Sequence, residues 1–175
     1  LTETVTLAAA SADGSRASGT IDLGAYVNVP TGQAIAIDQV DFIHQAGTAF
    51  TQHPAGMVSG NCTLSAQLTD LNPGTAFVRA DNQSLIASSA LNLDVTNNVS
   101  SQFSDIFPDN FGAPSTLSEA FMVVNDQLYL TIGNNGAAIS GANALEVTAR
   151  VRARVVKLSS EDWMAIAIQS TASDN

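Results

Sequence analysis

The sequence predicts an all-β protein, an antiparallel sandwich, barrel or jelly roll built from eight or nine short strands. Apolar residues recur at a spacing of two in most segments, and Gly, Pro, Asn and Asp residues separate these segments at short intervals. No long amphipathic helix lies between the segments, which excludes a βαβ architecture. An immunoglobulin-type sandwich is disfavoured because the chain has a single cysteine and cannot form the inter-sheet disulfide. The length suits one domain over residues 1–175.

Strand candidates are distributed along the whole chain. They cover residues 1–10, 18–29, 34–44, 61–71, 76–80, 90–97, 120–124, 127–133 and 144–158. The strictest alternation runs from Cys62 to Thr69, where four apolar residues share one face. The segment at 34–44 is rich in Ile and Val and is expected at the centre of a sheet. Its alternation slips between Asp38 and Asp41, which predicts a bulge there.

The connections between the strands carry recognisable turn chemistry. Asp-Gly at 13–14 and Asn-Pro-Gly at 72–74 predict tight turns. Residues 45–61 have no clear period and are interpreted as a long loop. Residues 97–118 contain two prolines and three phenylalanines, and we interpret them as a loop held by aromatic anchors. Asn-Asp at 125–126 predicts a hairpin between the two strand candidates that flank it.

The only helix signal lies near the end of the chain. Ser159 can cap a helix whose third residue is Asp162, and Glu161 favours the first turn. The apolar residues that follow would extend this helix by a turn or two. The sequence therefore predicts a short C-terminal helix or tail after the last strand.

The charge balance limits the classes of partner. The formal net charge is −10 and the pI is about 4.2, which disfavours nucleic acid as the main partner because phosphate binding depends on clustered Lys and Arg. Charged residues make up only 13% of the chain, so a polar surface of low charge is expected, which suits a subunit. The lone Cys62 is expected to be a buried free thiol. The chain lacks an apolar run of roughly 20 residues that could span a bilayer. Since it begins at Leu1, we expect that a preceding segment has been cleaved or is missing.

Catalytic and metal-binding signatures are weak. His44 and His53 are the two histidines, and neither lies in a nucleophile motif with a supporting carboxylate. The stretch GMVSG at 56–60 has its serine one place too late for a nucleophile elbow. Only the fold could bring the two histidines together with Asp38 and Asp41 as metal ligands. We therefore expect no enzyme activity, no cofactor and no metal site.

A secreted carbohydrate-binding or surface-filament β-sandwich is the alternative from another class. Sugar-binding modules usually present a platform of exposed Trp and Tyr side chains. Aromatic residues make up 6% of this chain, with one Trp, which weakens this alternative without removing it.

Four of the six basic residues lie in one run, ALEVTARVRARVVKLSSEDW, from Ala144 to Trp163. On a strand, Arg150, Arg152 and Arg154 would form a row on one face at a spacing of roughly 6.6 Å. The intervening residues Val151, Ala153 and Val155 would face the core, and Lys157 would follow at the end of the strand.

This row has four possible partners. The preferred one is carboxylates on neighbouring strands or on an adjoining subunit, because the guanidinium group pairs with them in bidentate geometry. An anionic surface, such as lipid headgroups or an acidic protein, comes second. Nucleic acid comes third, since three or four phosphate contacts on an acidic chain bind weakly. A small polyanion is the last.

The sequence resembles the single jelly-roll major capsid proteins of tailless, icosahedral, membrane-containing viruses. The resemblance lies in the strand count, in the loops rich in Gly, Asn and Pro, and in the final strand ending in VRARVVKLSSEDW. This resemblance implies a single jelly roll of eight or nine antiparallel strands in two packed sheets. It also implies a capsid subunit in the virion, assembling with itself and related capsid chains above an inner membrane or genome.

The resemblance leads to specific expectations for the partners. Arg150, Arg152, Arg154, Lys157 and Trp163 would contact neighbouring subunits or an anionic partner such as inner-membrane headgroups. The chain departs from many capsid proteins in lacking a basic N-terminal arm, since the opening residues include Glu3 and no Lys. Direct contact with nucleic acid is therefore not expected.

Overall fold

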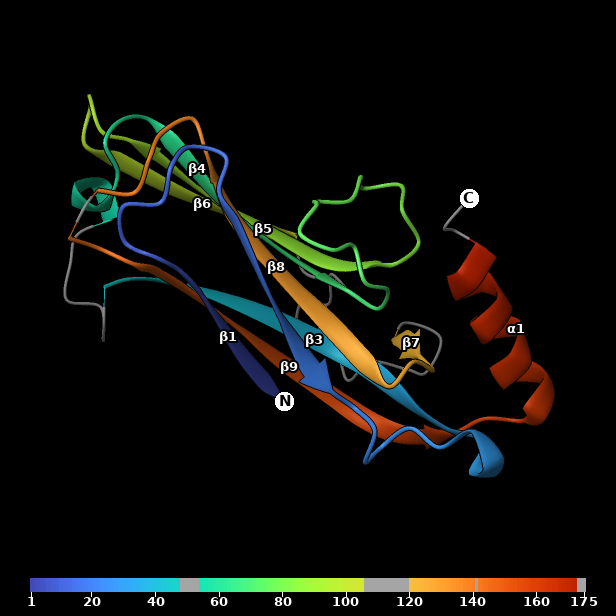
Figure 1. Cartoon of the computed structure of the whole chain (residues 1–175). Helices are drawn as coiled ribbons and strands as arrows, with labels where there is room; N and C mark the ends of the chain where they lie inside the picture. Colours follow the sequence, from blue (N-terminus) through green and yellow to red (C-terminus); the bar gives the residue numbers. More distant parts are fainter. Residues whose placement is uncertain (48–53, 106–119, 141, 173–175) are drawn as a thin grey trace.

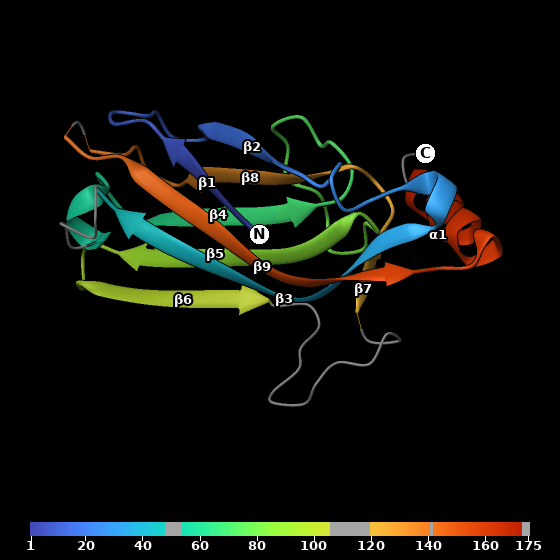
Figure 2. The same cartoon turned by 90° about the horizontal axis from the view of Figure 1, so that it is seen from below.

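The computed structural model describes residues 1–47, 54–105, 120–140 and 142–172, which form two antiparallel sheets packed face to face (Figures 1 and 2). The strands are β1 Thr2–Leu7, β2 Arg16–Asp22, β3 Gln33–Ala46, β4 Cys62–Thr69, β5 Leu85–Asp94, β6 Val99–Asp105, β7 Phe121–Val123, β8 Gln127–Asn135 and β9 Leu145–Lys157. Two short 3₁₀ helices, η1 Val29–Thr31 and η3 Pro54–Met57, lie in connections, and helix α1 spans Ser160–Ala172. Among the described residues, no helix is both long enough and apolar enough to cross a bilayer.

The strand order is that of a single jelly roll. The first sheet has the order β1-β9-β3-β7 and the second the order β2-β8-β4-β5-β6. The chain changes sheet at every connection except those between β4 and β5 and between β5 and β6, so that strands distant in sequence become neighbours, as in two nested Greek keys. The predicted all-β jelly roll is therefore confirmed.

The core lies between the two sheets and is built by alternation. Val147, Ala149 and Val151 of β9 face it from the first sheet, while Leu64 and Leu68 of β4 face it from the second. All of these side chains are at most 4% exposed. The predicted inward face of β4 is confirmed over its whole length, and Cys62 is a buried free thiol as expected.

The long strands β3 and β9 pair along almost their full lengths and are the two central strands of the first sheet. The ladder shifts between Ile37 and Gln39, so Asp38 is the extra residue of a bulge, as predicted. At the far end of the pair, the N–H of Leu158 donates to the carbonyl of Gly32 at 2.9 Å. β9 runs past the end of the second sheet here (Figures 1 and 2), which explains why Val155 is 50% exposed although the alternation predicted it to face the core.

Residues 76–80 do not form the predicted strand. They belong to a loop between β4 and β5 that docks on the outer face of the second sheet. The amide of Gln67 on β4 donates to the carbonyl of Val78 at 2.9 Å and accepts from its N–H at 2.8 Å. A side chain thus satisfies the two backbone groups that a strand partner would otherwise satisfy. The guanidinium group of Arg16 lies over the ring of Phe77, with the Arg16 Cζ atom 4.6 Å from the centroid of the ring.

Three other predicted connections differ from the structure. The second strand ends at Asp22, where the Asp22 carboxylate accepts from the N–H of Gly24 and turns the chain. The loop predicted over 97–118 contains strand β6 up to Asp105, and Phe107 and Phe111 lie outside the described residues. The predicted hairpin across 125–126 is wrong, because β7 pairs with β3 in the first sheet while β8 pairs with β2 and β4 in the second.

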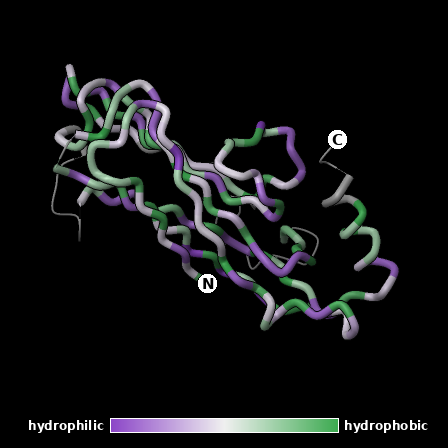
Figure 3. The backbone as a smooth tube through the Cα atoms, viewed as in Figure 1, coloured by the Kyte–Doolittle hydropathy of each residue, from purple (hydrophilic) through white to green (hydrophobic). Residues whose placement is uncertain are grey.

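The C-terminal helix begins where predicted. The Ser159 hydroxyl accepts from the N–H of Asp162 at 3.1 Å and donates to its carboxylate at 2.7 Å. α1 then leaves the end of the sandwich and stands apart from both sheets (Figure 1). Figure 3 shows that its acidic first turn is followed by mainly hydrophobic residues.

Candidate functional site

The basic row lies on the outer face of the first sheet. Arg150, Arg152 and Arg154 alternate with core-facing residues of β9, and all three are exposed. β9 lies between β1 and β3, so the row runs along the middle of this face. The spacing of two residues, which is visible in the sequence, is what places the three guanidinium groups on one side.

Arg154 pairs with the carboxylate at the bulge of β3. Its Nε donates to Asp38 Oδ2 at 2.8 Å and its Nη2 to Asp38 Oδ1 at 2.7 Å, which is the bidentate geometry that suits guanidinium and carboxylate groups. The hydrogen bonds to Asp38 raise the pKa of Arg154 above its ordinary value. Arg154 is therefore held by its own chain, and the bulge supplies its partner.

Arg150 and Arg152 are placed differently. Arg150 is aligned with Thr2 of β1 and Asp41 of β3, and Arg152 is aligned with Gln39. The Asp41 carboxylate accepts a hydrogen bond from the Gln39 amide at 2.9 Å. Within the described part of the chain, neither arginine forms an ion pair. Two exposed cations therefore lie side by side on this face.

Lys157 and Trp163 lie away from this row, at the end of the sandwich where β9 runs into α1. They line a groove together with η1 and the first turn of α1. Trp163 is half-buried, and its Nε1 is inaccessible to solvent and has no acceptor among the described residues. The structure thus separates the five predicted contact residues into two surfaces, the row of three arginines and the groove with Lys157 and Trp163.

The role of η1 in this groove was missed by sequence reasoning, which placed residues 18–29 in one strand. The segment NVPTG at 28–32 carries the missed signal, because Pro at the second of its helical residues and a glycine at its end favour a short helical turn. Gly32 has φ of 68°, and a Cβ there would lie 2.6 Å from the carbonyl oxygen of Leu158. Only glycine allows η1 to pack this closely against the start of α1.

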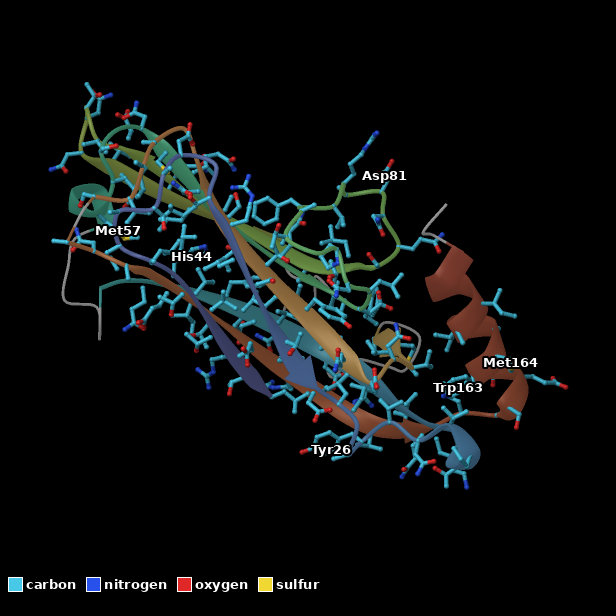
Figure 4. All side chains as sticks on the ribbon, viewed as in Figure 1. Tyr26, His44, Met57, Asp81, Trp163 and Met164 are labelled. Carbon is cyan, nitrogen blue, oxygen red and sulfur yellow. The ribbon has the colours of Figure 1, made fainter. Side chains whose placement is uncertain are left out.

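His44 is half-buried, and its two ring nitrogens are inaccessible to solvent. It follows Phe42 at a spacing of two on β3 and so faces the second sheet, and neither ring nitrogen has a hydrogen-bond partner among the described residues. Desolvation by burial lowers its pKa to about 4, an effect that the nearby Leu64 backbone partly offsets. In Figure 4 it lies towards the same end of the sandwich as Met57, the 1%-exposed side chain of η3. His44 is therefore neutral at pH 7.

No candidate metal-binding cluster is found within the described ranges. None of these residues form a group of three or more His, Cys, Asp or Glu side chains that could hold a metal ion. His53, the other candidate ligand, lies outside the described residues. Burial raises the pKa of the Cys62 thiol, and its Sγ contacts the carbonyl of Ala137 at 3.7 Å, as expected for a cysteine that packs in a core.

The fold and these surfaces define a single jelly-roll protein with an exposed arginine row on one sheet and a C-terminal helix that stands off the sandwich. No protein-family model matches the sequence, and no curated protein is significantly similar to it.

Proposed function

We propose that the chain is a structural virion protein, a capsid subunit that self-assembles into an icosahedral shell with copies of itself and related chains. The observation that carries this proposal is the jelly-roll strand order, β1-β9-β3-β7 facing β2-β8-β4-β5-β6. Viral capsid domains are a major class of jelly-roll protein, and lectins and cupins are others. Because a fold hosts several functions, the surface has to distinguish between them.

The surface favours assembly. Arg150 and Arg152 are exposed cations with no ion-pair partner in the described part of an acidic chain. Carboxylates are abundant on such a chain, so another copy of it is an obvious source of partners. In a closed shell each contact can be modest, since symmetry repeats it many times.

The carbohydrate-binding alternative fits this surface less well. A sugar platform needs several aromatic rings open to solvent. Among the residues whose burial is described, Tyr26 is the aromatic side chain in the exposed class, at 43%. Phe77 is engaged with Arg16, and Trp163 is half-buried beside η1. These aromatic residues lie on different elements and do not form one face.

An inner-membrane surface is the second possible partner of the arginine row. Anionic headgroups attract clustered Lys and Arg, but a chain of net charge −10 is repelled as a whole. We therefore place protein carboxylates first and headgroups second, and we expect no direct contact with nucleic acid.

Reversing the charge of the row tests the proposal. Arg152→Glu places a carboxylate between two arginines on an exposed face, so the subunit should fold normally, but the contact with acidic neighbours should become repulsive. We expect the yield of closed particles to fall by about tenfold or more, the change that about 1.4 kcal/mol produces in an equilibrium constant. Electron microscopy and light scattering of native and reassembled material would measure this yield.

Arg79→Glu is the matched control for this experiment. It makes the same change in net charge in an exposed loop, where Arg79 lies 3.4 Å from Asp81. This variant should assemble as the unmodified chain does. Normal particles from Arg152→Glu would contradict the role of the row. Native material that consists only of monomers or filaments, with monomers binding specifically on a glycan array, would contradict the capsid proposal itself.

A further inference from the structure

The end of the sandwich where β9 runs into α1 carries a groove that the jelly roll does not require. It has a volume of about 630 Å³ and lies between η1 on one side and the first turn of α1 on the other. Its apolar lining includes Val29 and Pro30 from η1 and Leu158, Trp163 and Met164 from the start of α1. Figure 4 shows Trp163 and Met164 together at the base of the helix.

The groove is held open by backbone contacts. Leu158 donates to the Gly32 carbonyl, and the positive φ of Gly32 brings η1 against this residue. The Ser159 cap then starts α1 immediately afterwards, so the helix leaves the sheet at a defined point. The backbone therefore sets the position of η1 relative to the first turn of α1, which lowers the entropic cost of binding at this point.

The rim of the groove is apolar and exposed. Val29 and Met164 are each 59% exposed, which is high for large aliphatic side chains that lie together. The Nε1–H of Trp163 is a buried hydrogen-bond donor without an acceptor among the described residues. A buried donor that forms no hydrogen bond costs free energy. Single exposed aliphatic residues are ordinary, but a group of them around a groove indicates an interaction site.

The charges beside the groove are complementary to each other. Lys157 lines the groove next to Leu158, and Glu161 lies in the first turn of α1, two residues before Trp163. Both charged side chains are exposed. Neither forms an ion pair within the described part of the chain. The groove and its immediate surroundings thus carry an exposed Met164, space for an apolar side chain, a cation and a carboxylate, which is what a self-complementary twofold contact needs.

We infer that this surface, the α1 notch formed by Val29, Lys157, Leu158, Glu161, Trp163 and Met164, is a twofold contact with a second copy of the chain. Met164 of each copy enters the groove of the other, and Lys157 of each copy pairs with Glu161 of the other. The inference rests on the proposed function, because it names one of the contacts between subunits that a shell requires.

A lipid surface is a poorer occupant of the α1 notch. The helix carries two carboxylates in its first turn, Glu161 and Asp162, and no Lys or Arg between Ser160 and Ala172. Interfacial helices usually have a basic polar face that is attracted to anionic headgroups. Another copy of this chain meets the charges of the notch with opposite charges, and a membrane does not.

Sedimentation equilibrium of the purified full-length chain tests the inference. The unmodified chain should show a monomer–dimer equilibrium, and Met164→Glu should raise its dissociation constant by about tenfold or more. Lys157→Glu and Glu161→Lys should each raise it, because each places like charges opposite one another. The double variant Lys157→Glu with Glu161→Lys should restore it, since the pair is re-formed with its charges exchanged.

Val99→Glu is the matched control, because Val99 is 53% exposed on β6 and lies outside the notch. It should leave the dissociation constant unchanged. Circular dichroism should show that every variant is folded, and Met164→Ala replaces Met164→Glu if the charged variant is not. A chain that stays monomeric, or charge reversals without rescue in the double variant, would overturn the inference. Binding to vesicles of phosphatidylcholine and phosphatidylserine that is lost in Met164→Glu, without any dimer, would overturn it as well.

The outcome separates this inference from the proposed function. Shells that assemble normally from Met164→Glu would disprove the notch contact and leave the capsid function standing. Notch-dependent dimers, with no shell in native material, would support the contact and disprove the capsid function.

Discussion

Half-buried His44 and buried Asp70 are titratable residues whose displaced pKa values affect stability in opposite directions. His44 is desolvated in the core, and its pKa falls to about 4 from 6.5. Asp70 is 3% exposed just after β4, its Oδ1 has no partner among the described residues, and burial raises its pKa to about 6 from 3.8. In both cases the folded state favours the neutral form.

These shifts predict two opposing pH dependences. The folded state disfavours protonated His44, so the stability linked to His44 is complete above about pH 6.5 and is lost as the pH falls towards 4. The folded state disfavours ionised Asp70, so the stability linked to Asp70 is complete below about pH 3.8 and is lost as the pH rises through 6. Between pH 4 and 6 the two effects oppose each other.

Urea unfolding of two variants between pH 4 and 7 would separate these effects. The free energy of unfolding of His44→Leu should increase by about 3 kcal/mol relative to that of the unmodified chain as the pH falls from 6.5 to 4, because leucine has no group to protonate. The free energy of unfolding of Asp70→Asn should likewise increase relative to that of the unmodified chain as the pH rises from 4 to 6. Parallel stability curves for the unmodified chain and both variants would show that neither group titrates as its burial implies.

At the scale of elements, the loop between β4 and β5 shows how a side chain can replace a strand. The AFVRA segment has a β-like composition, but β4, the strand it lies against, is already paired with β8 on one side and β5 on the other. Gln67 satisfies the two backbone groups of Val78 from the outer face of β4 instead. The loop is therefore docked on the sheet rather than paired within it.

Removing this amide should release the loop. Gln67→Ala breaks two hydrogen bonds to Val78, and we expect a loss of about 1–3 kcal/mol in the free energy of unfolding and faster cleavage by trypsin after Arg79. Gln67→Glu is the control, because it still accepts from the Val78 N–H and loses only the bond to the carbonyl. The free energy of unfolding and the cleavage rate of Gln67→Glu should lie between those of the unmodified chain and of Gln67→Ala. Equal cleavage rates in all three proteins would show that the amide does not hold the loop.

At the scale of the whole molecule, the sandwich and α1 differ in how they are held. β3 and β9 pair over almost their full lengths in the middle of the first sheet. α1 has 13 residues and leaves the sandwich after its capped first turn (Figure 1). Isolated helices of this length are marginally stable in water, so α1 depends on its attachment at the groove and on whatever binds there.

Hydrogen exchange should reveal this difference in dilute, monomeric protein. Amides of β3 and β9 should exchange only by global unfolding, while those of α1 should exchange faster by about tenfold or more through local opening. Protection of α1 should increase with protein concentration if the α1 notch forms a dimer. Protection of α1 equal to that of β9 in the monomer would contradict this description.

Much of the fold could be predicted from local patterns. Alternation located β1, β3, β4 and β9, and the slip after Ile37 located the bulge, because a half-buried strand must alternate wherever it lies. The Ser159 cap was equally local, since its partners lie within one turn. The prediction failed for the hairpin across 125–126, because turn chemistry shows that a chain turns but not which sheet it joins afterwards.

The sequence by itself determined the all-β class, the common face of Arg150, Arg152 and Arg154, and the start of α1. These features depend on spacings of two to four residues. Only the tertiary structure decided which carboxylate holds Arg154, that residues 76–80 dock on a sheet, and that η1 and α1 form one groove. Each of these depends on residues far apart in the chain, such as Asp38 with Arg154 and Gly32 with Leu158, which meet only because β3 pairs with β9 in the first sheet.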